Sequence, residues 1–297
     1  MSAHLAATPL LPADVAGDEV LLKLETFQPT GSFKVRGALA ALSRHREGGA
    51  RVVAASAGNH GLGVAYAAAA LGISATVVVS NNASPAKVEA LRRFGVDLVQ
   101  HGADYDAAEA HALALAEPGA VFVSAYNDPH VIAGQATLAA EVGASIDAPL
   151  TLVVPVGGGG LLAGTALWAK GRADVRIVGV EAAASRAVSS AVAAGRLVEV
   201  KVGETLADGL AGNMEAGCIT PDLVRDIDRI VAVTEPQIEE AIRFLATTAG
   251  VVVEGSGAVG VAALMAGKVD SLGRTVAFIT GRNIARPALA RILADTG

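Results

Sequence analysis

The chain has 297 residues, which is long for one domain and sufficient for two. Hydrophobic residues make up 52% of it and charged residues 18%, so the composition excludes an intrinsically disordered chain. The net charge of −6 and the pI near 5.5 argue against nucleic acid and anionic membranes as partners.

Cysteine content and the N-terminal stretch indicate the cellular setting. The single cysteine, Cys218, excludes an internal disulfide framework and suits a reducing compartment. The stretch MSAHLAATPLLPADVAGDEV lacks a basic start followed by an apolar run, so we expect no signal peptide. We therefore expect a cytoplasmic protein with no membrane partner.

Apolar segments rich in β-branched residues alternate with Ala-rich helical segments, as is typical of α/β proteins whose helices cover parallel sheets. The predicted strands are 20–25, 51–56, 73–79, 96–100, 120–124, 151–156, 175–181, 229–234 and 275–280. The four strands within 51–124 are expected to form a small sheet of their own. We predict an α/β fold with two open, mostly parallel sheets covered by helices. The predicted large domain comprises 1–48 and 129–297, and the small domain comprises 49–128.

The stretch LETFQPTGSFKVRGALAAL spans residues 24–42. Its Pro-Thr-Gly predicts a turn, and Ser32 is placed to cap a helix that runs from residue 33 to about 45. Lys34 lies in the first turn of this helix, where the helix dipole opposes a positive charge. This placement favours a neutral amine, which a lysine that forms a Schiff base requires. The ordinary alternative is a solvated surface lysine, which the apolar, turn-rich context disfavours.

A second stretch, ASAGNHGLGVA at 55–65, follows a predicted strand and opens a helix. The free N–H groups and the dipole at such a helix start suit an anion, for example the carboxylate of a substrate. Ser56, Asn59 and His60 are therefore candidate substrate-binding residues. Ordinary helix capping is the alternative for Asn59 and His60.

Residues 84–87 read Ser-Pro-Ala-Lys, which matches the S-x-x-K pattern of serine acyl-enzymes. The accompanying S-D-N and K-T-G motifs do not occur in the sequence. Ser84 before a proline is typical of an N-cap followed by proline at the first helical position. We therefore expect Ser84 to cap a helix and not to act as a nucleophile.

The stretch VVPVGGGGLLAG at 153–164 predicts a strand that breaks into four glycines and restarts as a helix. A loop in this position directs backbone N–H groups at a phosphate, and four glycines exceed what a tight turn needs. Gly158, Gly160 and Ala163 also match the dinucleotide pattern G-x-G-x-x-A, with Glu181 where a ribose-binding acid would stand. The loop predicts a phosphate site but leaves the cofactor open.

The last predicted strand ends at Thr280. Because the carboxyl ends of parallel strands meet at one sheet edge, we expect Thr280 beside the ligand crevice that the glycine loop marks. A buried threonine at a strand end is the ordinary alternative.

Five stretches together resemble the motifs of fold-type II pyridoxal-phosphate enzymes, in the serine/threonine dehydratase branch that includes threonine dehydratase and serine racemase. They are PTGSFKVRGA (29–38), ASAGNHGLGVA (55–65), VPVGGGGLLAG (154–164), VEGSGAVGVAAL (253–264) and ITGRN (279–283). They occur in the family order and span about residues 20 to 285. The resemblance implies a tryptophan synthase β-like fold with pyridoxal 5′-phosphate as the cofactor.

The resemblance also implies roles for single residues. Lys34 would hold the cofactor as a Schiff base and move the α-proton of the substrate. Phe33 would pack against the cofactor ring, and Asn59 would contact its 3′-oxygen. Thr280 would meet the pyridine nitrogen, and a hydroxyl there makes a weaker electron sink that suits β-elimination.

The remaining implied contacts concern the phosphate and the substrate. The phosphate would bind the backbone N–H groups of Gly157, Gly158, Gly159, Gly160 and Leu161. The substrate carboxylate would bind Ser56, Asn59 and His60. Glu254 and Arg282 are further candidates with no assigned role.

Two positions depart from the family pattern. Racemases of this branch carry a serine before the glycine of the asparagine loop, where this chain has Ala57, so racemisation is disfavoured. Members that bind Mg²⁺ or Ca²⁺ use a glutamate at the position of Glu181, a carbonyl at Ser185 and an aspartate where this chain has Ala187. A hard cation needs several oxygen ligands, so we expect no metal, with Glu181 the only doubtful candidate.

The expected activity is a pyridoxal-phosphate-dependent dehydratase, or ammonia-lyase. It would convert a β-hydroxy amino acid such as L-threonine or L-serine to a 2-oxo acid and ammonia. Serine racemase and hydroxyaspartate dehydratase are the alternatives within the family. An NAD-binding oxidoreductase and a non-catalytic amino-acid or cofactor-binding protein are the alternatives outside it. We expect a homodimer and, because little sequence follows the last motif, no inhibition by isoleucine.

Overall fold

The computed structural model of the chain describes residues 4–45, 49–116, 119–147 and 149–294. The chain forms two compact units, each held together by contacts among its own residues. Unit 1 comprises residues 1–6 and 28–135, and unit 2 comprises residues 7–27 and 136–297. These limits differ from the predicted domains, 1–48 with 129–297 and 49–128, mainly in the placement of residues 28–48. The predicted domain limits stay a prediction.

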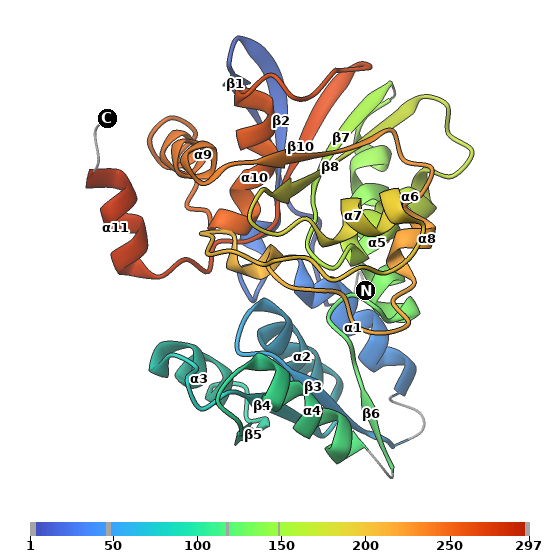
Figure 1. Cartoon of the computed structure of the whole chain (residues 1–297), viewed down its shortest axis with the longest axis vertical. Helices are drawn as coiled ribbons and strands as arrows, with labels where there is room; N and C mark the ends of the chain where they lie inside the picture. Colours follow the sequence, from blue (N-terminus) through green and yellow to red (C-terminus); the bar gives the residue numbers. More distant parts are fainter. Residues whose placement is uncertain (1–3, 46–48, 117–118, 148, 295–297) are drawn as a thin grey trace. The chain divides into compact units, whose positions relative to one another are not determined.

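Unit 1 contains a four-stranded parallel sheet in the order β5-β4-β3-β6 (Figure 1). The strands are β3 (Arg51–Ala55), β4 (Ala75–Val79), β5 (Asp97–Gln100) and β6 (Ala120–Phe122). The helices are α1 (Lys34–His45), α2 (Asn59–Leu71), α3 (Pro85–Arg92) and α4 (Tyr105–Ala116). Helix α5 (Pro129–Ser145) begins in unit 1 and ends in unit 2. The four strands predicted for the small sheet are all present.

Helices cover both faces of the sheet in unit 1, which explains why β3 is apolar from Val52 to Ala55. Val52 and Ala54 of β3 belong to one buried cluster with residues of α1 and α2. The alternate residues Val53 and Ala55 belong to a second cluster with residues of α4. Successive side chains of a strand point to opposite faces, so a strand buried on both faces reads as a continuous apolar run.

Unit 2 contains a six-stranded sheet in the order β1-β2-β10-β7-β8-β9, in which only the β1–β2 pair is antiparallel (Figure 1). The strands are β1 (Leu10–Val15), β2 (Asp18–Leu24), β7 (Leu150–Pro155), β8 (Val175–Ala182), β9 (Arg229–Val233) and β10 (Arg274–Ile279). The predicted α/β class with two open, mostly parallel sheets is therefore confirmed.

The helices of unit 2 lie on its sheet and around the ends of its strands. Helices α9 and α10 share one buried cluster with strand residues, and α6 packs on β7 and β8. The α-helices are α6 (Gly160–Ala169), α7 (Ala187–Ala194), α8 (Thr220–Leu223), α9 (Glu235–Thr247), α10 (Gly255–Met265) and α11 (Arg286–Ala294). The 3₁₀ helices are η1 (Glu25–Phe27) and η3 (Asp208–Leu210).

Strand β1 and its hairpin with β2 were not predicted. Pro12 lies in β1, where it is tolerated because β1 is an edge strand. The turn places both Ala16, at φ 56°, and Gly17, at φ 92°, in the left-handed region. The side chain of Asp14 supports the turn by accepting the N–H of Gly17 at 2.8 Å.

The strand order reverses once in each parallel arrangement, and this reversal identifies where a ligand binds. In unit 2, β8 lies on one side of β7 and the later strand β10 lies on the other. In unit 1, β4 lies on one side of β3 and the later strand β6 lies on the other. Open α/β sheets bind ligands outside the carboxyl ends of the strands at such a reversal. The fold thus points to the ends of β7 and β10, and to the ends of β3 and β6.

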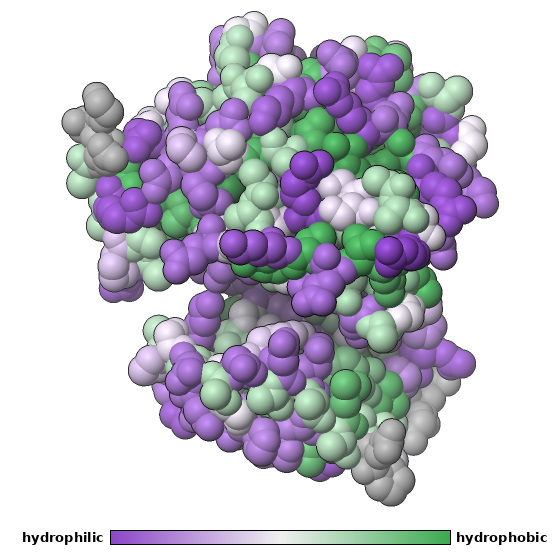
Figure 2. Space-filling view, viewed as in Figure 1, coloured by the Kyte–Doolittle hydropathy of each residue, from purple (hydrophilic) through white to green (hydrophobic). Residues whose placement is uncertain are grey.

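The surface agrees with an apolar interior. On the face drawn in Figure 2, hydrophilic residues cover most of the surface, and hydrophobic residues form scattered patches. Among the described residues, no helix is both long and apolar enough to span a membrane.

Candidate active site

The glycine loop links β7 to α6 in unit 2, as predicted. Gly159 adopts φ 86° and forms the N-cap of α6, which begins at Gly160. A Cβ atom on Gly159 would lie 2.9 Å from Oγ1 of Thr220, and one on Gly157 would lie 2.9 Å from Cα of Leu210. Both the left-handed backbone and the close neighbours therefore require glycine here.

The start of α6 presents backbone N–H groups that suit a phosphate. The first N–H groups of a helix have no intrahelical partner. Within the described part of the chain, no hydrogen bond is made by the N–H groups of Gly158, Gly159, Gly160 or Leu161. Because glycine has no side chain, a bound group can approach the backbone closely, and the positive end of the helix dipole favours an anion there. These residues fit the phosphate group of a cofactor.

Thr280 lies next to this loop on the neighbouring strand of the same sheet. Strands β7 and β10 pair in parallel, with Val153 opposite Ala277, so both run out at the same edge. Thr280 follows the last residue of β10 and is 2% exposed. Its hydroxyl donates to the carbonyl of Ser256 at 3.5 Å, a long and weak hydrogen bond. The strand pairing therefore brings Thr280 to the sheet edge where the glycine loop begins, as expected.

Glu254 forms hydrogen bonds with the segment that follows Thr280. Its side-chain Oε2 accepts the N–H of Asn283 at 3.1 Å. Its own N–H donates to the carbonyl of Gly281 at 3.0 Å. The carboxylate lies at the N-cap of α10, so it ties the chain after β10 to the start of this helix.

Arg282 is exposed, and its guanidinium donates to the main-chain carbonyl of Thr26. It also lines a cavity of about 360 Å³ together with apolar residues such as Leu24 and Val251. The guanidinium is thus bonded to the backbone after β2, which accounts for its orientation.

Lys34 is the first residue of α1 in unit 1. Its Nζ donates to the carbonyl of Ala125 at 2.8 Å and lies 5.3 Å from the centre of the Phe33 ring. The amine therefore reaches the chain that follows β6, on one side of the reversal in this sheet. Within the described residues, the buried hydroxyl of Ser32 has no hydrogen-bond partner, so the prediction that Ser32 caps this helix is wrong. By contrast, Ser84 caps α3 as predicted, by accepting the N–H of Lys87 at 3.4 Å.

The asparagine loop connects β3 to α2, on the other side of the same reversal. Asn59 is the first residue of α2, and Oγ of Ser56 accepts the N–H of Gly58 at 3.1 Å. A Cβ atom on Gly61 would lie 2.1 Å from the carbonyl oxygen of Ser56, so the loop folds tightly over the helix start. The first-turn N–H groups here can receive an anion.

The side chain of His60 has a different environment from the one expected for a carboxylate-binding residue. Its Nε2 lies 2.9 Å from the carbonyl oxygen of Val123 and must be the donor, because a carbonyl only accepts. Burial and the nearby charge of Lys34 lower the pKa of His60 to about 4, against 6.5 in the unfolded chain. The neutral ring thus keeps its proton on Nε2, and its Nδ1 only accepts. Only the main-chain N–H of His60 can donate to a carboxylate.

Glu181 caps a helix. Its Oε1 accepts the N–H groups of Val188 at 2.9 Å and of Ser189 at 3.1 Å, in the first turn of α7. The side chain is 1% exposed, and its burial raises the pKa of the carboxyl group. Glu181 thus stabilises the start of α7 from within the protein interior. In the part of the chain that the structure describes, no three His, Cys, Asp or Glu side chains are grouped as metal ligands.

Two residues at the carboxyl edge of the unit 2 sheet were missed from the sequence. Thr220 donates from its hydroxyl to the carbonyl of Gly158 at 2.7 Å. Ser256 accepts the N–H of Gly209 at 3.0 Å through Oγ, and its carbonyl accepts the Thr280 hydroxyl. Ser256 belongs to a recognised motif, but nothing around Thr220 in the sequence indicates a contact with a loop some sixty residues earlier.

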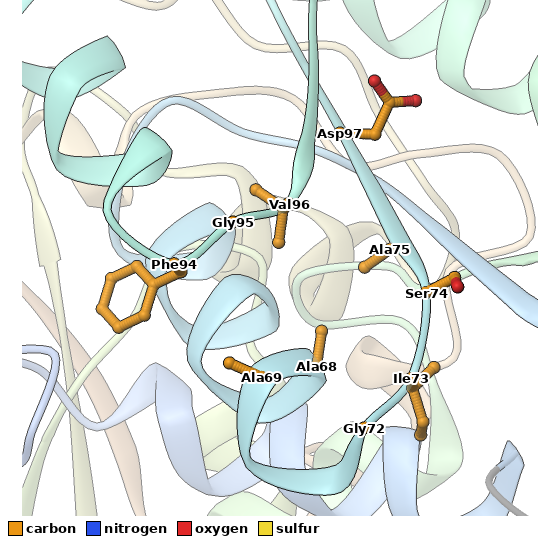
Figure 3. Close-up of a pocket in the computed structure, with 10 residues that line it drawn as sticks. All are labelled: Ala68, Ala69, Gly72, Ile73, Ser74, Ala75, Phe94, Gly95, Val96 and Asp97. Carbon is orange, nitrogen blue, oxygen red and sulfur yellow. The ribbon is translucent and has the colours of Figure 1, made fainter.

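Unit 1 contains a cavity of about 400 Å³ (Figure 3). It is lined by the end of α2, around Gly72, by Ala75 at the amino end of β4, and by the turn from Phe94 to Asp97. The predicted site residues of unit 1 stand instead at the carboxyl ends of β3 and β6. No predicted site residue lines this cavity.

The family of this chain follows from comparison with known proteins. The profile of the family described as "Pyridoxal-phosphate dependent enzyme" matches residues 1–281. The chain belongs to this family. It is 43% identical over 289 residues to the L-threonine ammonia-lyase of Thermotoga maritima, covering 95% of this chain and 71% of that protein. It is 37% identical over 287 residues to the catabolic L-threonine dehydratase TdcB of Escherichia coli K12, covering 94% of this chain and 86% of that protein.

Solved structures of this family have the same fold. Maize serine racemase superposes with a TM-score of 0.90 at 30% identity, covering 99% of this chain and 93% of that one. The processed threonine deaminase isoform 2 of Solanum lycopersicum superposes with a TM-score of 0.88 at 31% identity, covering 98% of this chain and 88% of that one. The predicted family, its threonine dehydratase and serine racemase branch, the fold and the dependence on pyridoxal phosphate are confirmed.

Replacing Gly159 with alanine tests the requirement for glycine in the loop. A non-glycine residue in the left-handed region costs about 1–2 kcal/mol, and the new methyl group would also press on Thr220. We expect Gly159→Ala to lower the free energy of unfolding in urea by about 2 kcal/mol or more. The matched control is Gly171→Ala, at φ 82° with nothing within 4 Å of its Cβ, which carries the backbone cost alone. Equal losses in the two variants would contradict the contact with Thr220.

The buried histidine predicts a pH dependence of stability. Well above pH 6.5, His60 is neutral in both the folded and the unfolded chain. As the pH falls from 6.5 to about 4, only the unfolded chain binds the proton, so the wild type should lose stability that His60→Gln retains. The shift corresponds to about 3 kcal/mol.

Urea unfolding of both proteins between pH 7 and pH 4 measures this difference. His130→Gln is the control, because His130 is exposed. Parallel pH profiles for the wild type and His60→Gln would rule out a depressed pKa at His60.

Proposed function

We propose that this chain is a pyridoxal-phosphate-dependent L-threonine ammonia-lyase, which releases ammonia and a 2-oxo acid from its substrate. The observation that carries the proposal is the pairing of β7 with β10, which brings Thr280 to the same sheet edge as the start of α6, whose first N–H groups suit a phosphate. The threonine ammonia-lyase and dehydratase relatives, which match 94–95% of the chain, confirm the predicted reaction class. L-serine is the second substrate that we expect the enzyme to accept.

The residues of unit 2 would hold the cofactor by its phosphate and its ring nitrogen. The N–H groups of Gly157, Gly158, Gly159, Gly160 and Leu161 would bind the phosphate. The Thr280 hydroxyl would hydrogen-bond the pyridine nitrogen, and its bond to Ser256 is weak enough to be exchanged. A neutral hydroxyl, unlike a carboxylate, does not stabilise a protonated nitrogen.

The residues of unit 1 would act on the substrate. When bound, the cofactor withdraws electrons from the α-carbon of the amino acid. Nζ of Lys34 would hold the cofactor and then take the proton from the α-carbon. The N–H groups at the start of α2 and the Ser56 hydroxyl would orient the carboxylate, while the side chain of Asn59 would contact the 3′-oxygen of the cofactor. Phe33 would pack against the ring.

Loss of water completes the proposed reaction. Once the α-proton is removed, the β-hydroxyl group leaves with a proton as water, and hydrolysis gives the 2-oxo acid and ammonia. Racemisation would require an acid on the face of the ring opposite Lys34. The position that supplies a serine in racemases of this branch is Ala57, which has no proton to give. This residue supports a lyase over a racemase.

We also propose the finer points of assembly and location. The homodimer rests on the family resemblance, and sedimentation of the purified protein tests it. The cytoplasmic location rests on the composition, with its one buried thiol at Cys218. Absence of a metal requirement is the expectation from Ala187, and activity after treatment with a chelator tests it.

Lys34→Ala tests the proposed function directly. Loss of a group that transfers a proton in the rate-limiting step costs at least about a hundredfold in rate, so ammonia release from L-threonine should fall by that factor or more. Lys170→Ala is the control, because Lys170 is exposed at the far end of α6. After borohydride reduction of the wild type, mass spectrometry should find the pyridoxyl group on the peptide that contains Lys34. Full activity of Lys34→Ala would refute the assignment.

Ala57→Ser tests the choice of lyase over racemase. A hydroxyl at this position would supply the missing proton donor, so we expect the ratio of D-serine to pyruvate formed from L-serine to rise. Chiral chromatography together with a pyruvate assay measures that ratio. Ala86→Ser, on the exposed side of α3, is the matched control. An unchanged ratio in a folded, cofactor-loaded variant would show that Ala57 does not decide the outcome.

A further inference from the structure

Thr220 contacts the glycine loop, although the proposed reaction assigns no role to it. It is the first residue of α8 and is fully buried, at 0% exposure. Its hydroxyl donates to the carbonyl of Gly158 at 2.7 Å. Its Oγ1 and Cβ atoms stand 2.9 and 3.0 Å from where a Cβ of Gly159 would be. Thr220 therefore contacts both residues of the Gly158–Gly159 peptide.

The hydroxyl of Thr220 is itself held by a second group. Sγ of Cys218 lies 3.1 Å from Oγ1 of Thr220. Because the one hydroxyl proton of Thr220 goes to Gly158, the thiol must be the donor in this contact. Burial raises the pKa of Cys218 and so keeps the thiol protonated. Two hydrogen bonds therefore follow one another. The thiol of Cys218 donates to the Thr220 hydroxyl, and this hydroxyl donates to the carbonyl of Gly158.

Peptide geometry turns this hydrogen bond into a constraint on the phosphate site. In a planar trans peptide, the C=O and the N–H point in opposite directions. The carbonyl of Gly158 and the N–H of Gly159 belong to the same peptide. Because the carbonyl is directed at Thr220, the N–H of Gly159 must point away from Thr220, on the open side of the loop. Without this hydrogen bond, a peptide flanked by two glycines is free to rotate.

We propose that Thr220 is a positioning residue whose hydroxyl fixes the Gly158–Gly159 peptide so that the N–H of Gly159 meets the cofactor phosphate. The proposal rests on the assignment of the glycine loop as the phosphate site. It predicts that the hydroxyl of Thr220 matters to the phosphate and not to the pyridine ring.

The test compares two forms of the cofactor that differ only in the phosphate. Dissociation constants are measured for pyridoxal 5′-phosphate and for pyridoxal, from the visible absorbance of the bound form. Thr220→Val keeps the shape and removes the hydroxyl, whereas Thr220→Ser keeps the hydroxyl. Thr165→Val is the matched control, because the buried Thr165 hydroxyl donates to the carbonyl of Leu161 within α6 at 2.9 Å.

We expect Thr220→Val to bind pyridoxal 5′-phosphate about tenfold more weakly, which corresponds to about 1.4 kcal/mol, because the carbonyl of Gly158 loses its hydrogen-bond donor. Its affinity for pyridoxal should be unchanged. Thr220→Ser should restore the affinity for pyridoxal 5′-phosphate to within about twofold, and Thr165→Val should leave it unaltered. The ³¹P chemical shift of the bound phosphate should move in Thr220→Val and return in Thr220→Ser.

The outcomes separate this proposal from the one on which it rests. A wild type that binds pyridoxal as tightly as its phosphate would refute the phosphate site itself. A wild type that prefers the phosphate, with the same preference in Thr220→Val, would overturn the role of Thr220 alone. Equal losses in Thr220→Val and Thr220→Ser would show that shape and not the hydroxyl matters. Should Thr220→Val fail to fold, Thr220→Ala removes the same hydroxyl without adding a methyl group and takes its place.

Discussion

The left-handed turn at Gly159 is the constraint on which the proposed phosphate site depends. The chain must pass from β7 to α6 within a few residues and still leave the N–H groups of the new helix unpaired. The chain does so here with Gly159 at φ 86°, a conformation that glycine adopts without strain. The hydrogen bond from Thr220 to the carbonyl of Gly158 then fixes the direction of a peptide that two glycines would otherwise leave mobile.

In unit 1, too, the candidate residues lie at the carboxyl ends of strands, but they carry different chemical groups. There the loop after β3 opens α2, and Lys34 reaches the chain after β6. One sheet presents N–H groups and a hydroxyl, which we propose meet the phosphate and the ring nitrogen of the cofactor. The other offers an amine, a serine hydroxyl and a helix start suited to a carboxylate. Each set stands where the order of its strands reverses, so the topology of each unit explains why these groups lie near one another.

The sequence predicts the parts of this structure that depend on local pattern. The strand runs, the glycine loop and the cap at Ser84 follow from residue type and spacing, and all are observed. Strand β1 was missed because Pro12 and a left-handed alanine at position 16 do not signal a hairpin. Ser32 was misplaced as a cap because sequence does not reveal which residue begins the helix. Thr220 and the engaged side chain of His60 depend on long-range contacts, to which no short pattern is sensitive.

The one thiol of the chain lies behind the glycine loop, and this makes Cys218 a natural reporter. It is buried against Thr220, so a thiol reagent reaches it only when this support opens. The rate at which such a reagent labels Cys218 therefore measures how often the contact between Thr220 and the glycine loop opens. No probe has to be introduced. Since the sequence contains no other cysteine, the signal arises from this position alone. Slow labelling in the presence of the cofactor and faster labelling without it would report the coupling of ligand to loop in kinetic terms.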